Sequence, residues 1–138
     1  MTDIKHYRML IDGAWVGASD GKTFASVNPT TGQVWAMIPE ATADDVDRAV
    51  RAADRAFSAG PWPDMTPTQR GHCLRRLGDL LADTSEALGN VETIDTGKML
   101  KETRWQARYI AEFFHFFAGC ADKIHGETLP IDKAEAGL

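Results

Sequence analysis

Glu112 and His115 form the one Glu-x-x-His pair in the chain, a spacing that places two possible metal ligands on a single helix face. In di-iron four-helix bundles, a Glu-x-x-His pattern supplies two ligands in this way. Such a centre needs a second copy of the pattern, and the 138 residues contain only this one. We therefore interpret His115 as a helix-packing residue, with a metal-binding helical bundle as an alternative.

The cysteines and the remaining histidines do not suggest a metal site or a disulfide. Cys73 and Cys120 lie far apart in the sequence, with no Cys-x-x-Cys pair and no Cys/His cluster around them. We expect both thiols to pack in the core. His6, His72 and His125 have no partner at a ligand spacing, and we assign them no function.

The composition is typical of a globular protein and excludes several functional classes. Hydrophobic residues make up 43% and charged residues 25% of the chain, unlike a disordered or collagen-like protein. The net charge is -5 and no Lys/Arg run exceeds a pair, so nucleic acid is not an expected partner. No apolar run approaches a membrane span of roughly 18 residues, and residues 1–10 are too charged for a signal peptide. The sequence therefore predicts a cytoplasmic protein with no membrane partner.

The elements that must position these residues begin with strands and turns over residues 1–40. Residues 9–16 hold two short apolar stretches around an Asp-Gly pair, which is typical of a hairpin turn. Residues 22–28 and 33–38 are further extended stretches, and the Pro-Thr-Thr-Gly segment between them predicts a turn.

Three helical regions are expected next, over residues 41–60, 66–97 and 100–125, because apolar residues recur there at helical spacing. The first two regions begin with capping-box patterns, and the second is expected to bend or restart near residues 83–85. The third is apolar around more than half of its circumference, which is typical of a helix buried in a larger body. Residues 126–138 show no periodicity and predict a loosely ordered tail. The segment thus reads as a β-hairpin region followed by three largely apolar helices.

Local patterns between residues 8 and 132 resemble the aldehyde dehydrogenase superfamily. They include Leu-Ile-Asp-Gly-Ala-Trp, Val-Asn-Pro-Thr-Thr-Gly and Glu-Thr-Ile-Asp-Thr-Gly-Lys, and the matching segments are 10–15, 27–32, 44–57, 70–81, 92–98 and 117–123. The six segments follow the family's order and lie near its spacing. The resemblance implies an α/β parent fold of Rossmann-like type, in which residues 1–138 form the N-terminal part of the NAD(P)-binding domain.

The resemblance also implies an oxidoreductase that converts an aldehyde to a carboxylic acid with NAD or NADP as cofactor. In the family, a cysteine thiolate attacks the aldehyde, hydride passes to the nicotinamide, and a glutamate activates the water that hydrolyses the thioester. The corresponding Gly-Gln-x-Cys, Glu-Leu-Gly-Gly and Pro-Trp-Asn patterns do not occur in the 138 residues. We assign no catalytic or cofactor-binding residue, and we predict that this chain alone oxidises no aldehyde. Its expected partners are the remainder of the dehydrogenase and further copies in a homo-oligomer.

Two sites follow from the resemblance. Many relatives bind Na⁺ or K⁺ through two backbone carbonyls and an aspartate, and these map to Ser26, Val27 and Asp95, a set of hard oxygen donors. The alternative is that Asp95 bonds only to backbone groups near the helix stop at Gly97.

The second implied site is the tunnel through which the aldehyde reaches the cysteine. Counting back from Phe-Ala-Gly at residues 117–119 places Gln106, Tyr109, Ile110 and Phe113 on its wall, where aromatic rings would favour an apolar or aromatic aldehyde. An aromatic stripe at helical spacing also suits plain core packing. The alternative function is a stand-alone helical interaction module or inactive relic whose aromatic helix binds a protein partner.

Overall fold

The computed structural model describes residues 4–129, in which five short strands precede five helices. The strands are β1 (Lys5–His6), β2 (Met9–Ile11), β3 (Ala14–Val16), β4 (Thr23–Val27) and β5 (Val34–Pro39). The helices are α1 (Ala43–Ser58), α2 (Pro61–Asp64), α3 (Pro67–Asp83), α4 (Ser85–Thr96) and α5 (Leu100–Cys120). Every strand therefore lies before residue 40 and every helix after it.

The hairpin of β2 and β3 turns at Asp12 and Gly13. Both residues have positive φ, 53° and 75°, which is the backbone that a two-residue turn of type I′ requires and that an Asp-Gly pair adopts readily. The strands pair antiparallel with Met9 opposite Val16. The hairpin predicted from the Asp-Gly pair is thus present.

The other three strands form a small mixed sheet in the order β1-β5-β4. β4 runs antiparallel to β5, and β1 runs parallel to it. The turn between β4 and β5 is closed by Asn28, whose backbone N–H donates to the Gln33 carbonyl and whose side chain accepts from the Thr30 N–H, at 2.9 Å in each case. Ala36 of β5 is completely buried, so the middle of this strand is part of the small core.

Both predicted capping boxes are present and fix where α1 and α3 begin. Thr42 caps α1 with Asp45, and Thr66 caps α3 with Gln69. Between the first two predicted helical regions, the stretch from Gly60 to Asp64 contains the single turn of α2. Proline at the first position of a helix needs no partner for a missing N–H, so this turn can form there.

The helices α3, α4 and α5 pack through their smallest residues. A Cβ atom added at Gly71 would lie 2.7 Å from the Ala118 carbonyl oxygen of α5. One added at Gly89 of α4 would lie 2.8 Å from the Arg104 backbone of α5. The buried residues of α5 are likewise small, namely Thr103, Ala107, Ala111 and Ala118. The absence of bulky side chains at this contact lets the helix backbones approach closely.

The expectation of three largely apolar helices is wrong. The expected region 66–97 restarts at Thr84, within the predicted residues 83–85, and gives two separate helices, α3 and α4. Four helices of three turns or more therefore follow the strands, and all of them carry charged residues. α5 also ends at Cys120 rather than residue 125. Most of its aromatic side chains lie away from the buried alanine face, and Phe116, for example, is 65% exposed. Phe114, which lies between Ala111 and Ala118 on that face, is half-buried. A wide apolar arc therefore did not identify the buried face.

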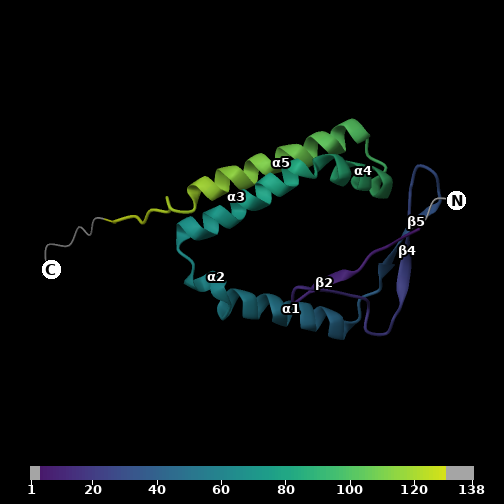
Figure 1. Ribbon diagram of the computed structural model, residues 1–138, viewed down its shortest axis with the longest axis horizontal. Coiled ribbons are helices and arrows are strands. Elements are labelled where there is room, and N and C mark those ends of the chain that lie inside the picture. The colour runs from purple at the N-terminus through teal and green to yellow at the C-terminus, as the bar shows by residue number, and fades with distance from the viewer. Residues whose placement is uncertain (1–3, 130–138) are drawn as a thin grey trace, which may run out of the picture.

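Figure 1 shows an open arrangement of the elements. α3, α4 and α5 lie together, α1 and α2 lie across from them, and the strands lie at one end. Of the predicted tail, residues 130–138 lie outside the described residues, and residues 124–129 contain neither helix nor strand. A search of the described helices for a long apolar segment that could cross a membrane finds none.

Candidate functional site

Ser26 and Asp95, predicted to share a cation site, lie in direct contact. The Ser26 hydroxyl, on β4, donates to Asp95 Oδ1 at the end of α4, with 2.6 Å between the oxygens. Trp35 of β5 donates its indole Nε1–H to the same Ser26 oxygen at 3.0 Å. The Trp35 contribution had no local signal in the sequence, because it depends on how β4 and β5 pair.

Val27, the third predicted ligand, follows Ser26 at a register irregularity between β4 and β5. Its side chain is exposed, and only its backbone carbonyl could bind an ion. The predicted ligand atoms are the backbone carbonyls of Ser26 and Val27 and the Asp95 carboxylate, all hard oxygen donors that suit a monovalent cation. The structure brings the Asp95 carboxylate to the Ser26 side chain. Binding of Na⁺ or K⁺ to Ser26, Val27 and Asp95 stays a prediction.

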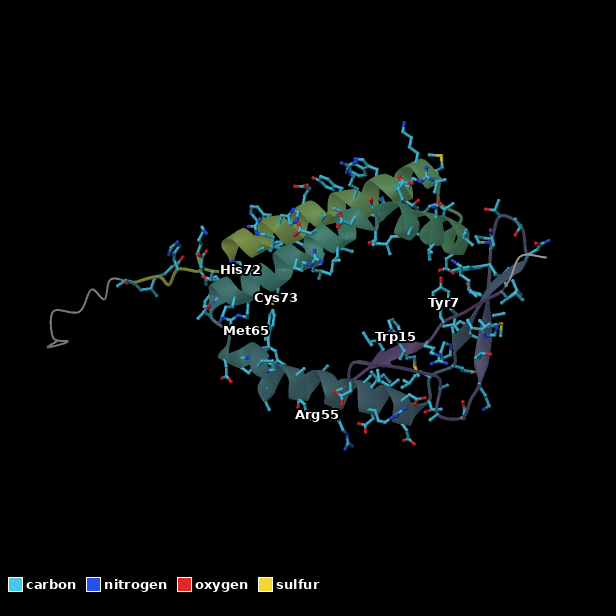
Figure 2. The ribbon with its side chains drawn as sticks, in the orientation of Figure 1. Tyr7, Trp15, Arg55, Met65, His72 and Cys73 are labelled. Atoms are coloured by element: carbon cyan, nitrogen blue, oxygen red, sulfur yellow. The ribbon has the colours of Figure 1, made fainter. Side chains whose placement is uncertain are left out.

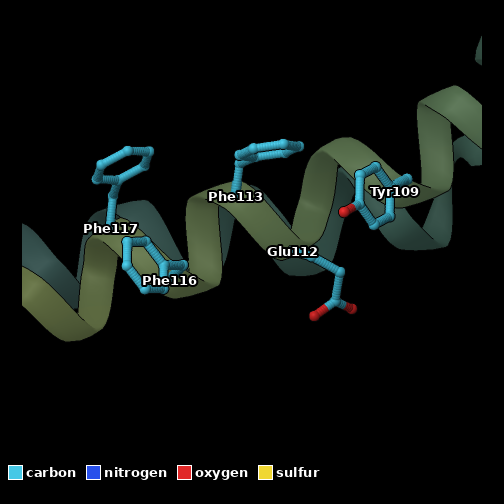
Figure 3. Close-up of a pocket in the computed structure, with 5 residues that line it drawn as sticks. All are labelled: Tyr109, Glu112, Phe113, Phe116 and Phe117. Carbon is cyan, nitrogen blue, oxygen red and sulfur yellow. The ribbon is translucent and has the colours of Figure 1, made fainter.

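The aromatic side of α5 forms an open cavity of about 490 Å³. Figure 3 shows the residues that line it, which are Tyr109, Glu112, Phe113, Phe116 and Phe117. Tyr109 and Phe113 meet edge to face with ring centres 5.4 Å apart, and Trp105 stacks on Tyr109 at 4.8 Å. Edge-to-face and stacked pairs are favourable geometries for aromatic rings, so these residues support one another along the helix. The lining of the cavity is mainly apolar and includes one carboxylate, that of Glu112.

Two of the four predicted tunnel residues, Tyr109 and Phe113, line this cavity, whereas Gln106 and Ile110 do not. Gln106 instead donates its side-chain amide to Glu102 at 3.3 Å. Sequence reasoning missed Glu112, Phe116 and Phe117 as lining residues. Their spacing of three or four residues from Tyr109 and Phe113 could have identified them, because residues so spaced share a helix face.

Glu112 and His115 serve different faces of α5. His115 Nε2 lies 3.0 Å from Asp79 Oδ1 of α3, whereas Glu112 lines the aromatic cavity. Within residues 4–129, no group of three His, Cys, Asp or Glu side chains lies close enough to hold a metal ion. The contact with Asp79 agrees with the interpretation of His115 as a helix-packing residue.

The expectation that both cysteines pack in the core is wrong for Cys73, whose side chain is exposed, while Cys120 is half-buried. Figure 2 shows Cys73 beside His72 in the first half of α3. In this turn of α3, Gly71 is the residue that packs against α5, and the Cys73 thiol lies away from that contact. Neither cysteine forms a disulfide.

Asp45 is the most strongly perturbed acid among the described residues. Its side chain is almost wholly buried and accepts hydrogen bonds from the backbone N–H groups of Ser19 and Thr42, both at 3.0 Å. These N–H donors, and then Arg48, hold the pKa of Asp45 well below its ordinary value. Burial acts in the opposite direction and is outweighed. The site joins the loop after β3 to the beginning of α1, and we assign it a structural role.

The model of the aldehyde dehydrogenase family matches residues 15–138, nearly the whole chain. The chain belongs to the aldehyde dehydrogenase family. The (Z)-2-((N-methylformamido)methylene)-5-hydroxybutyrolactone dehydrogenase of Acinetobacter baylyi is 42% identical over 133 residues, which are 96% of this chain and 27% of that protein. Other relatives have names that place them in mitochondria or in the cytosol.

Solved structures of family members contain the same arrangement. An NAD-dependent aldehyde dehydrogenase from Sinorhizobium meliloti matches with a TM-score of 0.86 and 36% identity, over 91% of this chain and 25% of that one. A betaine aldehyde dehydrogenase mutant from Staphylococcus aureus, solved with NAD⁺, matches with a TM-score of 0.83 and 38% identity. The match covers 92% of this chain and 26% of that one. The chain thus spans about a quarter of the length of the Acinetobacter, Sinorhizobium and Staphylococcus proteins, and this is their N-terminal quarter.

Proposed function

We propose that these 138 residues form the N-terminal part of the NAD(P)-binding domain of an NAD(P)-dependent aldehyde dehydrogenase, which as a whole oxidises an aldehyde to a carboxylic acid. The supporting observation is that the fold and the sequence together match the N-terminal quarter of such enzymes. The family's patterns for the nucleophile, the general base and the oxyanion donor do not occur among the 138 residues. The contribution of this chain is therefore structural support and a wall for the substrate.

In this proposal, α5 supplies part of the path of the aldehyde. Tyr109 and Phe113 form an apolar wall together with Phe116 and Phe117, and such a wall favours an apolar or aromatic aldehyde. Glu112 lies at the edge of the same surface and gives it one negative charge. Gln106 and Ile110, which do not line the cavity, would meet the aldehyde only if the remaining part of the enzyme closes around α5.

The remainder of the dehydrogenase is the proposed partner of the exposed apolar side chains. On α1, Val46, Val50 and Phe57 recur at helical spacing and are all exposed, with Phe57 at 71%. A row of exposed apolar residues on one helix face is typical of a surface that another part of a protein covers. Homo-oligomer formation, a cytoplasmic location and cation binding at Ser26 and Asp95 stay predictions.

The proposal is tested by a chimera in which this chain replaces the corresponding N-terminal quarter of the Acinetobacter relative. The chimera is expected to fold and to reduce NAD⁺ or NADP⁺ with an aldehyde, measured by the absorbance of the reduced nicotinamide. The 138-residue chain alone is expected to give no reduction. Turnover by the purified chain alone would contradict the assignment, as would a folded chimera that binds nucleotide but oxidises none of the aldehydes that the relative accepts.

The exposed rings of α5 also support the alternative of an interaction module that binds a protein partner. The chimera distinguishes the two functions. An interaction module has no reason to complement a dehydrogenase, whereas an N-terminal domain part must do so.

A further inference from the structure

The described residues form two parts that meet at few points. Residues 4–64 contain the sheets, α1 and α2, and residues 67–129 contain α3, α4 and α5. The chain passes from one part to the other at residues 65–66, near α2, where Figure 2 labels Met65. Across the molecule, at the strand end, β4 approaches the end of α4. The relative position of the two parts depends on this second contact.

A single side-chain hydrogen bond joins the two parts. Among residues 4–129, the bond from Ser26 to Asp95 is the one hydrogen bond or ion pair that links residues 4–64 to residues 67–129. Pro29 adds a packing contact, because a Cβ atom built at Gly97 would lie 3.0 Å from its ring. Separation of the parts would thus break this hydrogen bond together with the packing around Pro29 and Ile94.

The direction of the hydrogen bonds at Ser26 is fixed by chemistry. An indole N–H can only donate, so Trp35 Nε1 must donate to Ser26 Oγ. The serine hydroxyl has one hydrogen, which is then directed to the Asp95 carboxylate at 2.6 Å, within the range of a charge-assisted O–H···O⁻ bond. The indole hydrogen and the hydroxyl hydrogen therefore each have one acceptor. We call these two consecutive hydrogen bonds the Trp35–Ser26–Asp95 relay, and no bound ion is required to complete it.

We propose that the Trp35–Ser26–Asp95 relay is a latch that fixes the sheet part against the helical part, and that this latch holds in the absence of any bound cation. Trp35 and Ser26 are positioning residues in this role. Trp35 is itself held from its other side by Tyr7, whose ring meets it edge to face at 5.8 Å. A cation bound nearby would add to the latch, but it would not create it.

The test is a double-mutant cycle on the 138-residue chain with Ser26→Ala, which removes the donor, and Asp95→Ala, which removes the acceptor, read as thermal midpoints in choline chloride and in potassium chloride at equal ionic strength. Each single variant is expected to lower the midpoint by roughly 3–6 °C, the effect of one lost hydrogen bond of this kind. The double variant is expected to fall no further than the larger single change, because both variants remove the same bond. The result should be the same in both salts.

Ser58 and Asp54 provide the matched control, since the same two residue types meet there at 3.4 Å on the exposed face of α1. Ser58→Ala and Asp54→Ala are expected to leave the midpoint nearly unchanged. Additive effects at Ser26 and Asp95, or effects no larger than in the control pair, would overturn the latch. Effects that occur only in potassium chloride would also overturn it, because a bound K⁺ ion, and not the hydrogen bond, would then hold the two parts together.

If Ser26→Ala or Asp95→Ala does not fold, Trp35→Phe supplies an independent measurement, because it removes the indole donor and keeps an aromatic ring beside Tyr7. Its midpoint is expected to fall in choline chloride. An unchanged midpoint would overturn the proposal.

Discussion

Gly71→Ala is expected to destabilise the chain, although alanine is the better helix former. In an open helix position, replacing glycine by alanine adds about 1 kcal/mol of stability. At Gly71, however, the new methyl group would lie 2.7 Å from the Ala118 carbonyl oxygen and 3.2 Å from the Ala121 Cβ. The atom that it meets first belongs to the backbone of α5, so the helices themselves must move apart.

Overpacking of this kind costs about 1–3 kcal/mol, and a rigid backbone obstacle places Gly71 near the upper end. After the helix-propensity gain is subtracted, the expected net loss is about 2 kcal/mol. For a chain of this length, that loss lowers the thermal midpoint by roughly 6–8 °C. Circular dichroism of the wild type and the variant during heating measures the difference.

Gly119 is the control, because it lies in α5 and a Cβ atom there would meet nothing within 4 Å. Gly119→Ala is expected to raise the midpoint by up to roughly 3 °C, the change expected from helix propensity alone. Gly78→Ala should fall between the two, since its methyl group would meet the His115 ring at 2.6 Å and that side chain can rotate away. A Gly71→Ala variant that melts at or above the wild type would refute the close contact between α3 and α5.

Further predictions concern the caps, acid stability and the substrate wall. Thr66→Ala, which removes the cap of α3, is expected to lower the free energy of unfolding by about 1 kcal/mol in urea titrations, and an unchanged value would contradict the capping box. Because folding lowers the pKa of Asp45, its charge stabilises the chain above the ordinary carboxyl pKa of 3.8, and this contribution is lost as the pH falls toward the lowered value. Asp45→Asn is thus expected to reduce stability at neutral pH and to flatten its decline below about pH 4, and parallel acid titrations of both proteins would exclude this account. In the chimeric enzyme, Phe113→Ala is expected to raise KM for an aromatic aldehyde roughly tenfold through the loss of apolar contact, with a smaller effect on a short aliphatic one, and equal changes for both would argue against a substrate wall on α5.

Local signals predicted the local parts of this fold. The Asp-Gly turn of the hairpin and the capping boxes at Thr42 and Thr66 depend on neighbours within a few residues, and each is present. The contact between α3 and α5 could not be predicted in this way. Propensity rules treat Gly71 and Gly78 only as a cost to the helix, and the reason for them becomes visible once α5 lies against them.

In the candidate site, too, contacts between residues far apart in the sequence could not be predicted from local patterns. Ser26 and Asp95 are 69 residues apart, and only the family resemblance associated them in advance. Nothing in the sequence indicated that Trp35 contacts Ser26, because this contact depends on the pairing of β4 with β5. On α5, the wide apolar arc suggested burial on several sides, yet in this chain the alanines are buried and all the aromatic rings except that of Phe114 are exposed. Hydrophobicity indicates which residues favour contact, but it does not say which partner supplies it.

α5 has a buried alanine face and an exposed aromatic face, so substitutions on the two faces have different consequences. Changes at Tyr109, Phe113 or Phe116 alter the proposed substrate wall and leave the close approach of the helix backbones intact. Changes at Ala111 or Ala118 do the reverse. A library that randomises only the aromatic positions can therefore explore new ligand preferences on a scaffold whose assembly stays constant, and natural divergence can follow the same route.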